Sequence, residues 1–295
     1  MPATLVVTGA SGQLGRAIAG EVAALRGSRA GLVLASRSPS ALDGAPAGAE
    51  ARRADFGDPA SLATAFSGAD RVLVISTDDI DGRAAGQIAA IDAAKAAGVG
   101  HILYTSMLSP VPENPAIIAP SHRATEEHLR ASGVPFTILR AGFYADFQVF
   151  EAAEALASGR LVHNRGGGRC AYLTRADIAR ATAAVLVGGG HEGETLDLTG
   201  TEAYDAAALA AEYAAAGGRA VEPVEVGDEE LLDLLGGSAE GHNQYGAHLT
   251  VSIGQAIRGG FLDVVTDTVA ELTGTAPESL GSVLARNVEV LRSIR

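Results

Sequence analysis

A glycine-rich run near the start of the chain constrains its fold more than any other feature. Residues 5–15 read Leu-Val-Val-Thr-Gly-Ala-Ser-Gly-Gln-Leu-Gly, and an Ala-rich helical pattern follows. A strand, a tight turn and a helix start in this order predict a binding site for a dinucleotide pyrophosphate. The alternative is an ordinary strand-to-helix turn, because glycine supplies 37 of the 295 residues.

Each glycine of this run has its own predicted role. Gly9 lets the backbone turn off the strand, Gly12 lets the main chain approach the phosphates, and Gly15 lets the first helix pack against the sheet. Free N–H groups at the helix N-terminus then face the anion. The residues expected to bind the cofactor here are Thr8, Gly9, Ser11, Gly12, Gln13, Leu14 and Gly15.

Composition and charge argue against several classes of protein. The chain is 47% hydrophobic, but no apolar run approaches the roughly 20 residues of a membrane helix. We expect no signal peptide, because the first predicted strand starts at Leu5. Cys170 is the only cysteine, and we predict neither a disulfide nor a bound metal. The net charge of −13 argues against a nucleic-acid partner. We expect a cytoplasmic protein without membrane or nucleic-acid partners.

Strands and helices alternate through the first half of the chain. The candidate strands are Leu5–Thr8, Leu32–Ser36, Ala51–Ala54, Arg71–Ile75, His101–Thr105 and Phe136–Arg140. The candidate helices are Gln13–Leu25, Ser40–Leu42, Pro59–Phe66, Arg83–Ala97 and His122–Ser132. Such alternation predicts an α/β fold, a Rossmann-type doubly wound parallel sheet covered by helices on both faces.

The pattern loosens after about Gly142, where we expect a smaller mixed α/β substrate lobe. Residues 1–145 are predicted to form the dinucleotide-binding core, with strands from about 160–200 returning to it. Residues 146–295 are predicted to form mainly the lobe, interleaved with the core and sharing one cleft with it. Thr174 and Asp177 are typical of a helix capping box.

Arg37 follows the second predicted strand, where dinucleotide-binding folds select the ribose. An acidic residue at this place binds the 2′-hydroxyl of NAD, whereas a basic residue pairs with the 2′-phosphate of NADP. From the end of the second predicted strand, no acidic residue occurs before Asp43. Arg37 can stack on adenine, and Ser11 can add a hydroxyl. We therefore predict NADP(H) as the cofactor. The alternative is a solvated surface arginine.

Several further motifs occur in order along the chain. They are Thr8–Gly15, Ala54–Asp58, Tyr104–Ser106, Ser121-His122 with Glu126, and Leu139–Tyr144. With them the chain resembles the NmrA-like, atypical branch of the short-chain dehydrogenase/reductase superfamily. Within that branch it is most similar to bacterial NADPH:quinone oxidoreductases. The similarity covers nearly the whole chain, including Thr273–Leu280. It implies that Asp55 and Phe56 border the adenine and that Ser76 and Thr77 line the dinucleotide.

The expected catalytic residues depart from the pattern of the superfamily. Most members use a Tyr-x-x-x-Lys pair, but alignment on Glu126 places His122 at the lysine position and Ile118 at the tyrosine position. The resemblance assigns His122 to hold the nicotinamide ribose or to donate a proton, which its ordinary pKa near 6.5 permits. Glu126, one helical turn away, could orient it. The alternative is a surface histidine without a role.

Tyr144 and Ser106 complete the predicted catalytic set of His122, Tyr144, Ser106 and Glu126. Tyr144 follows the sixth strand and could stack on a flat ring or donate its hydroxyl, or it could be a packing residue. Ser106 and His122 are also expected at the cofactor, although Ser106 could simply cap a loop.

A second group of polar side chains consists of Glu240, His242, Tyr245 and His248. It lacks a His-Glu-x-x-His motif, and we interpret it as a polar wall of the substrate cleft rather than a metal site. The segments expected to build the substrate pocket are 108–120, 143–150 and 236–250.

Loss of the Tyr-Lys pair favours reduction of a quinone or enone over alcohol dehydrogenation, because carbonyl reduction needs a positioned acid. We expect an oxidoreductase that transfers hydride from NADPH to a quinone or similar conjugated small molecule. The alternatives are an NADP(H)-binding redox sensor without turnover, or a biosynthetic reductase of an enone or imine. Helix-mediated dimers are common in the superfamily, so a homodimer is a further expectation.

Overall fold

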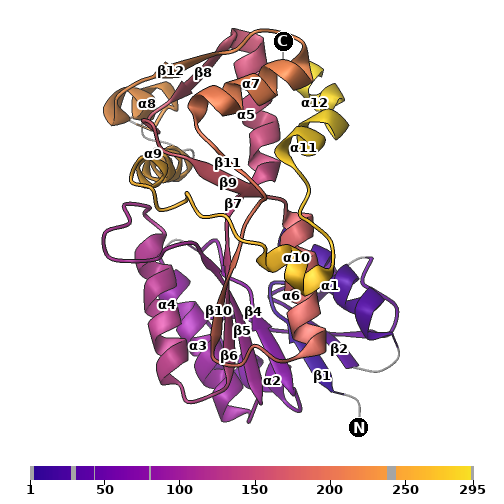
Figure 1. Cartoon of the computed structure of the whole chain (residues 1–295). Coiled ribbons are helices and arrows are strands. Elements are labelled where there is room, and N and C mark those ends of the chain that lie inside the picture. The colour runs from indigo at the N-terminus through magenta and orange to yellow at the C-terminus, as the bar shows by residue number, and fades with distance from the viewer. Residues whose placement is uncertain (1–2, 28–30, 43, 80, 238–243, 294–295) are drawn as a thin grey trace.

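The computed structural model describes residues 3–27, 31–42, 44–79, 81–237 and 244–293. Its centre is a seven-stranded sheet in the order β10-β6-β5-β4-β1-β2-β3, with every neighbouring pair parallel (Figure 1). The strands are β1 (Thr4–Val7), β2 (Gly31–Ser36), β3 (Ala49–Arg53), β4 (Arg71–Val74), β5 (His101–Met107), β6 (Phe136–Ala141) and β10 (Glu194–Leu198). The predicted doubly wound α/β fold is confirmed.

Alternating side chains on these strands fill two separate cores. On β1, Leu5 and Val7 pack on one face of the sheet, whereas Val6 packs on the other, as the two-residue period of a strand requires. Helices α1 (Gln13–Arg26) and α6 (Arg175–Gly188) cover the first face. The helices over the second face are α2 (Pro59–Phe66), α3 (Arg83–Ala96) and α4 (Ala119–Ala131).

Helix starts follow the capping residues visible in the sequence. Asp58 accepts hydrogen bonds from the N–H groups of Ala60 and Ser61 at the start of α2. Thr174 accepts from the N–H of Asp177 at 3.0 Å, which confirms the predicted cap of α6. Helix α4 starts three residues earlier than predicted, so His122 lies within its first turns rather than at its start.

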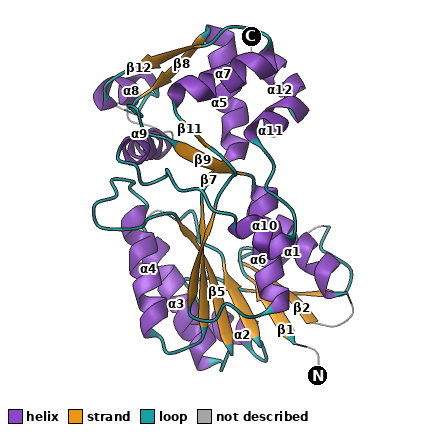
Figure 2. Cartoon of the chain, in the orientation of Figure 1, coloured by secondary structure: helices purple, strands orange, loops and turns teal. Residues whose placement is uncertain are grey.

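A smaller lobe lies beyond the carboxyl ends of the strands of the large sheet (Figures 1 and 2). Its sheets have the orders β11-β9-β7 and β12-β8. Its strands are β7 (Phe143–Tyr144), β8 (Arg160–His163), β9 (Cys170–Leu173), β11 (Ala203–Tyr204) and β12 (Glu222–Glu225). Its helices are α5 (Ala145–Ser158), α7 (Ala206–Gly217), α8 (Asp228–Leu234), α9 (Gln244–Arg258), α11 (Leu280–Arg286) and α12 (Val288–Ser293).

Two elements outside the lobe complete the fold, the 3-10 helix η1 (Pro39–Ala41) and α10 (Thr268–Thr273). Helix α10 packs against α6 and β10, so the C-terminal region returns to the large sheet before it rejoins the lobe. Of the strands within 160–200, β10 lies in the large sheet, whereas β8 and β9 pair within the lobe. No helix in the described part of the chain is long and apolar enough to span a bilayer.

Gly15 offers a stability test with a matched control on the same helix. A Cβ added at Gly15 would lie 2.2 Å from the carbonyl oxygen of Gly9, whereas one added at Gly20 meets nothing within 4 Å. We expect Gly15→Ala to lower the free energy of unfolding by about 1–3 kcal/mol through overpacking. Gly20→Ala should raise it by about 0.5–1 kcal/mol through helix propensity. Urea unfolding of both variants measures the difference, and equal effects would contradict the close approach at Gly15.

Candidate functional site

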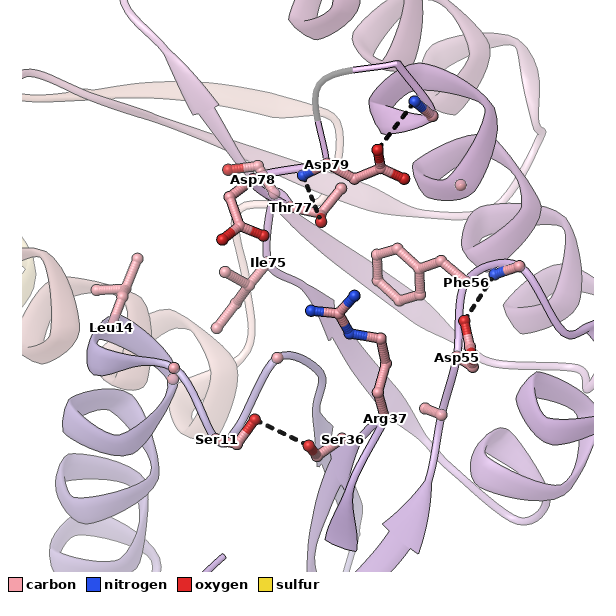
Figure 3. Close-up of a pocket in the computed structure, with 18 of the residues that line it drawn as sticks. Ser11, Leu14, Ser36, Arg37, Asp55, Phe56, Ile75, Thr77, Asp78 and Asp79 are labelled. Atoms are coloured by element: carbon pink, nitrogen blue, oxygen red, sulfur yellow. Dashed lines mark hydrogen bonds between the residues drawn. The ribbon is translucent and has the colours of Figure 1, made fainter. Parts of the chain in front are cut away.

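A cavity of about 690 Å³ lies over the carboxyl ends of β1, β2, β3 and β4 (Figure 3). Its volume is in the range of small-molecule and cofactor sites. The cavity is lined by Gly9, Ser11, Gly12, Gln13, Leu14, Gly15, Ser36, Arg37, Ala54, Asp55, Phe56, Gly57, Pro59, Ile75, Ser76, Thr77, Asp78, Asp79, Gly82, Ala85, Gly86, Ala89 and Tyr144. The fold therefore brings most of the predicted cofactor residues together.

The glycine turn forms one end of this cavity. Gly9 has a φ of +60°, a conformation that favours glycine, and its carbonyl accepts a hydrogen bond from the N–H of Gly12 at 2.9 Å. Gly12 occupies the N-cap of α1, and no side chain caps the helix. The first-turn N–H groups therefore remain available for an anion, as a bound pyrophosphate requires. A Cβ on Gly15 would meet the turn itself, so this glycine serves turn–helix packing rather than the predicted helix–sheet packing.

Thr8 lies behind the cavity rather than in its wall. Its buried hydroxyl donates to the carbonyl of Leu73 at 2.9 Å and accepts the N–H of Ile75 at 3.0 Å. Thr8 thereby ties the end of β1 to the end of β4. Thr8 therefore supports the neighbouring wall and does not line the cavity, so these contacts do not support the predicted contact of Thr8 with the cofactor.

Arg37 lies at the end of β2, where it extends into the cavity toward Phe56 (Figure 3). Arg37 is exposed and forms no ion pair with any residue that the structure describes. Beside it, the Ser36 hydroxyl donates to the Ser11 hydroxyl at 2.9 Å. This end of the cavity thus offers a guanidinium group and two hydroxyls, which suit a phosphate ester.

Asp55 and Phe56 follow β3, and Arg37 lies between them and the glycine turn (Figure 3). The Asp55 carboxylate accepts the N–H of Gly57 at 3.1 Å, which fixes its own turn. Phe56 packs against α3 so closely that a Cβ at Gly86 would lie 3.1 Å from it. The ring therefore forms a fixed apolar wall, and Gly86 is a lining residue that the sequence did not indicate.

Tyr144 is the predicted catalytic residue that the fold does place in the cavity wall. Its ring stacks on Phe147 with centroids 5.9 Å apart, and the Arg175 guanidinium lies 4.9 Å from its centroid. Burial raises the pKa of Tyr144, so its hydroxyl stays protonated at neutral pH. Tyr144 can therefore offer both a fixed ring face and a hydrogen-bond donor.

Ser106 and Glu126 lie outside the cavity wall and form a buried charged cluster. The Glu126 carboxylate accepts the Ser106 hydroxyl at 2.7 Å and the Arg140 guanidinium at 2.9 and 2.7 Å. Burial opposes ionisation of Glu126, but the Arg140 and Ser106 hydrogen bonds outweigh it and lower the pKa of this carboxyl. Glu126 thus fastens α4 to β5 and β6. The hypothesis that Glu126 orients His122 is not supported by these contacts.

His122 is 5% exposed and receives its orientation from Tyr104. The Tyr104 hydroxyl lies 2.8 Å from His122 Nδ1. Burial lowers the pKa of His122 to about 4, and the positive charge of Arg83 adds to this, whereas Glu126 opposes it. The expectation of an ordinary pKa near 6.5 is therefore wrong. At neutral pH the imidazole is uncharged, and it can donate a hydrogen bond but cannot act as an imidazolium acid.

The second polar group is only partly visible, because Glu240 and His242 lie outside the described residues. Tyr245, on α9, accepts a hydrogen bond from Arg83 at 3.4 Å, so this part of the lobe reaches the first residue of α3. His248 is exposed. Among the described side chains, no cluster of three or more His, Cys, Asp or Glu could hold a metal ion.

The glycine turn, the parallel sheet and the cavity over its strand ends define a dinucleotide-binding Rossmann protein. The sequence matches the family model described as NAD(P)H-binding over residues 9–187. The chain therefore belongs to this NAD(P)H-binding family. In the sequence comparison it is 37% identical to quinone oxidoreductase 2 of Escherichia coli over 219 residues, which is 74% of this chain and 76% of that protein.

Solved structures agree with this assignment. The NADPH complex of the same Escherichia coli quinone oxidoreductase superposes with a TM-score of 0.89 and 32% identity, covering 96% of this chain and 99% of that one. Triphenylmethane reductase of Citrobacter sp., complexed with NADP(H), gives a TM-score of 0.85 and 31% identity, over 96% and 99% of the two chains. A Streptomyces griseus (4-alkanoyl-5-oxo-2,5-dihydrofuran-3-yl)methyl phosphate reductase is 30% identical over 275 residues, 92% of this chain and 93% of that protein.

The low pKa of His122 makes folding stability depend on pH. Above pH 6.5 the histidine is neutral in both states, but below it the unfolded chain binds a proton that the folded chain refuses down to about pH 4. Acidification from pH 7 to 5 should therefore remove about 2 kcal/mol through this group. Urea unfolding at both pH values should show a smaller loss in His122→Asn. The exposed control His248→Asn should behave like the wild type, and an unchanged loss in His122→Asn would contradict the assignment.

Proposed function

We propose that the chain transfers hydride from NADPH to a quinone or a similar conjugated acceptor. The observation that carries this proposal is one continuous cavity with the glycine turn and Arg37 at one side and Tyr144 also in its wall. The first set of groups suits a phosphorylated dinucleotide, and the aromatic face suits a flat acceptor. The NADPH-bound quinone oxidoreductase at a TM-score of 0.89 supports the same assignment.

Residues of this chain would hold the cofactor at defined places. The N–H groups that open α1 would bind the pyrophosphate, and Arg37 with Ser11 would bind the 2′-phosphate. Phe56 would border the adenine, and the loop of Ser76 and Thr77 would line the dinucleotide. Bound NADPH supplies the hydride. We propose these roles for the residues that line the cavity, while direct contact of Thr8 with the cofactor is not part of the proposal.

The proton balance fits a quinone better than an isolated carbonyl. A quinone gains two electrons and two protons to become a hydroquinone, and hydride supplies both electrons and one hydrogen nucleus. The remaining proton can come from water, so no side chain with a pKa near 7 is required. The neutral His122 and Tyr144 would then donate hydrogen bonds to the acceptor instead of supplying the proton.

Arg37 provides a test of cofactor choice. Losing a hydrogen bond to a charged phosphate costs about 1.5–3 kcal/mol, so Arg37→Ala should raise the KM for NADPH by about 10- to 100-fold. The KM for NADH should change little, because NADH lacks the 2′-phosphate. Arg123→Ala, at an arginine on α4 outside the cavity wall, is the matched control. Equal effects of Arg37→Ala on both cofactors would contradict the assignment.

Turnover separates the proposed enzyme from its alternatives. We expect oxidation of NADPH, followed by its absorbance, with a panel of quinones, and Tyr144→Ala should raise the KM for the quinone more than Tyr144→Phe does. Tight binding of NADP(H) without turnover of any acceptor would instead favour a redox sensor. Turnover only of an unsaturated lactone, as the name of the Streptomyces griseus relative suggests, would favour the biosynthetic reductase. A cytoplasmic location and a homodimer stay predictions.

A further inference from the structure

A buried series of hydrogen bonds connects the cavity wall to His122. Gln87, on α3, accepts the backbone N–H of Thr77 through Oε1 at 3.2 Å. Its Nε2 group donates to the Tyr104 hydroxyl at 3.1 Å and to the Thr125 hydroxyl at 2.8 Å. Tyr104 in turn contacts His122 Nδ1 at 2.8 Å. Gln87, Tyr104 and Thr125 are all 0% exposed, so no bulk water competes for these groups.

The hydrogen bonds made by Gln87 and Thr125 have directions that their donors and acceptors fix. A backbone N–H can only donate, so the Gln87 atom that faces Thr77 is its oxygen, and its NH₂ group faces Tyr104 and Thr125. The Thr125 hydroxyl donates to the Ser121 carbonyl at 2.8 Å and therefore accepts from Gln87. Tyr104 accepts from Gln87, and its single proton is then available to His122 Nδ1, 2.8 Å away. With the proton donated in this direction, Nδ1 is an acceptor, and a neutral His122 carries its proton on Nε2.

We propose that Gln87 and Tyr104 are positioning residues that lock His122 in the Nε2–H tautomer and link its orientation to the Thr77 peptide. Arg83 also holds this peptide, because its Nε donates to the Thr77 carbonyl at 2.8 Å. Two side chains of α3, Gln87 and Arg83, therefore form hydrogen bonds with Thr77 in the cavity wall. A shift of that wall would be transmitted to His122 through a single amide group.

The charges around His122 agree with a neutral ring. Arg83 from α3 disfavours the imidazolium form, Glu126 from α4 favours it, and burial outweighs both. Tyr104 from β5 remains protonated, because burial raises its pKa. The Tyr104 proton further favours an unprotonated Nδ1. No residue in the described part of the chain forms a hydrogen bond with Nε2, so its hydrogen-bonding capacity is not used by these residues.

The catalytic consequence rests on the proposed function, but the tautomer does not. If a quinone or related acceptor binds within reach of His122, which lies behind the residues that line the cavity, the Nε2–H group would be a fixed donor for its oxygen. Loss of the lock in Tyr104→Phe should lower kcat/KM for the acceptor by about tenfold, the effect of one hydrogen bond, and leave the KM for NADPH unchanged, because Tyr104 does not contact the Thr77 peptide. The ring would then be free to present Nε2 as an acceptor, which cannot stabilise a developing oxyanion.

The test is nitrogen NMR of the ¹⁵N-histidine-labelled full chain at pH 7, with the His122 signals assigned by their absence in His122→Asn. We expect an unprotonated Nδ1 and a protonated Nε2 in the wild type. Tyr104→Phe and Gln87→Met should each produce a mixture of tautomers. Tyr104→Phe should also raise the pKa of His122. His101, which is also buried and bonds Thr137 at 2.9 Å, serves as an internal control whose signals should not change.

A protonated Nδ1 in the wild type would overturn the proposal, even if neither variant folds. A pure Nε2–H form in both folded variants would also overturn it. If the wild type reduces no acceptor but shows the expected tautomer, the proposed function fails and the positioning role stands. If the wild type reduces the acceptor but carries its proton on Nδ1, the positioning role fails and the proposed function stands. Unchanged kcat/KM in a variant with mixed tautomers would remove the catalytic consequence alone.

Discussion

Parallel pairing of the seven central strands is the constraint on which the site depends. Because the strands run in one direction, β1, β2, β3 and β4 all end at one edge of the sheet. Groups that are distant in sequence therefore line a single cavity, from the glycine turn to the Thr77 loop. Thr8 reinforces this arrangement, since its hydroxyl satisfies polar backbone groups on β4. The cofactor residues are thus positioned by backbone geometry more than by contacts among themselves.

Buried polar side chains add a second level of positioning. An unpaired polar group in a core costs several kcal/mol, so each one restricts how its element can pack. Glu126 and Arg140 fix α4 against β6, and Gln87 fixes α3 against the Thr77 peptide and Tyr104. These contacts leave little freedom for rotation of α3 or α4. The chemistry available to His122 follows from this packing, because burial and one tyrosine decide its charge and its tautomer.

Local signals explain why much of the cofactor site could be predicted from the sequence. Gly9, Arg37, Asp55 and Ser76 each lie within two residues of the end of a strand, and the parallel fold brings strand ends together. The environment of His122 could not be predicted in this way. Its partner Tyr104 lies 18 residues away, and its pKa depends on burial and on the charges of Arg83 and Glu126. The lobe strands β7, β8 and β9 have two to four residues each, too few for a periodic pattern. Ser106 and Glu126 were expected near the reactants because the motif does not reveal that Arg140 engages the carboxylate.

The path of the chain between the large sheet and the lobe has an evolutionary consequence. The chain passes between these two parts after β6, after β9, after β10 and on both sides of α10. At two of these passages, Gly142 and Gly200 approach the backbone of β9 so closely that a Cβ would lie 3.0 and 2.1 Å from carbonyl oxygens. The lobe is therefore not one continuous segment, and recombination could not exchange it as a single insert. New acceptors must be acquired by point substitution or by changes in single loops, with the reductase scaffold inherited whole.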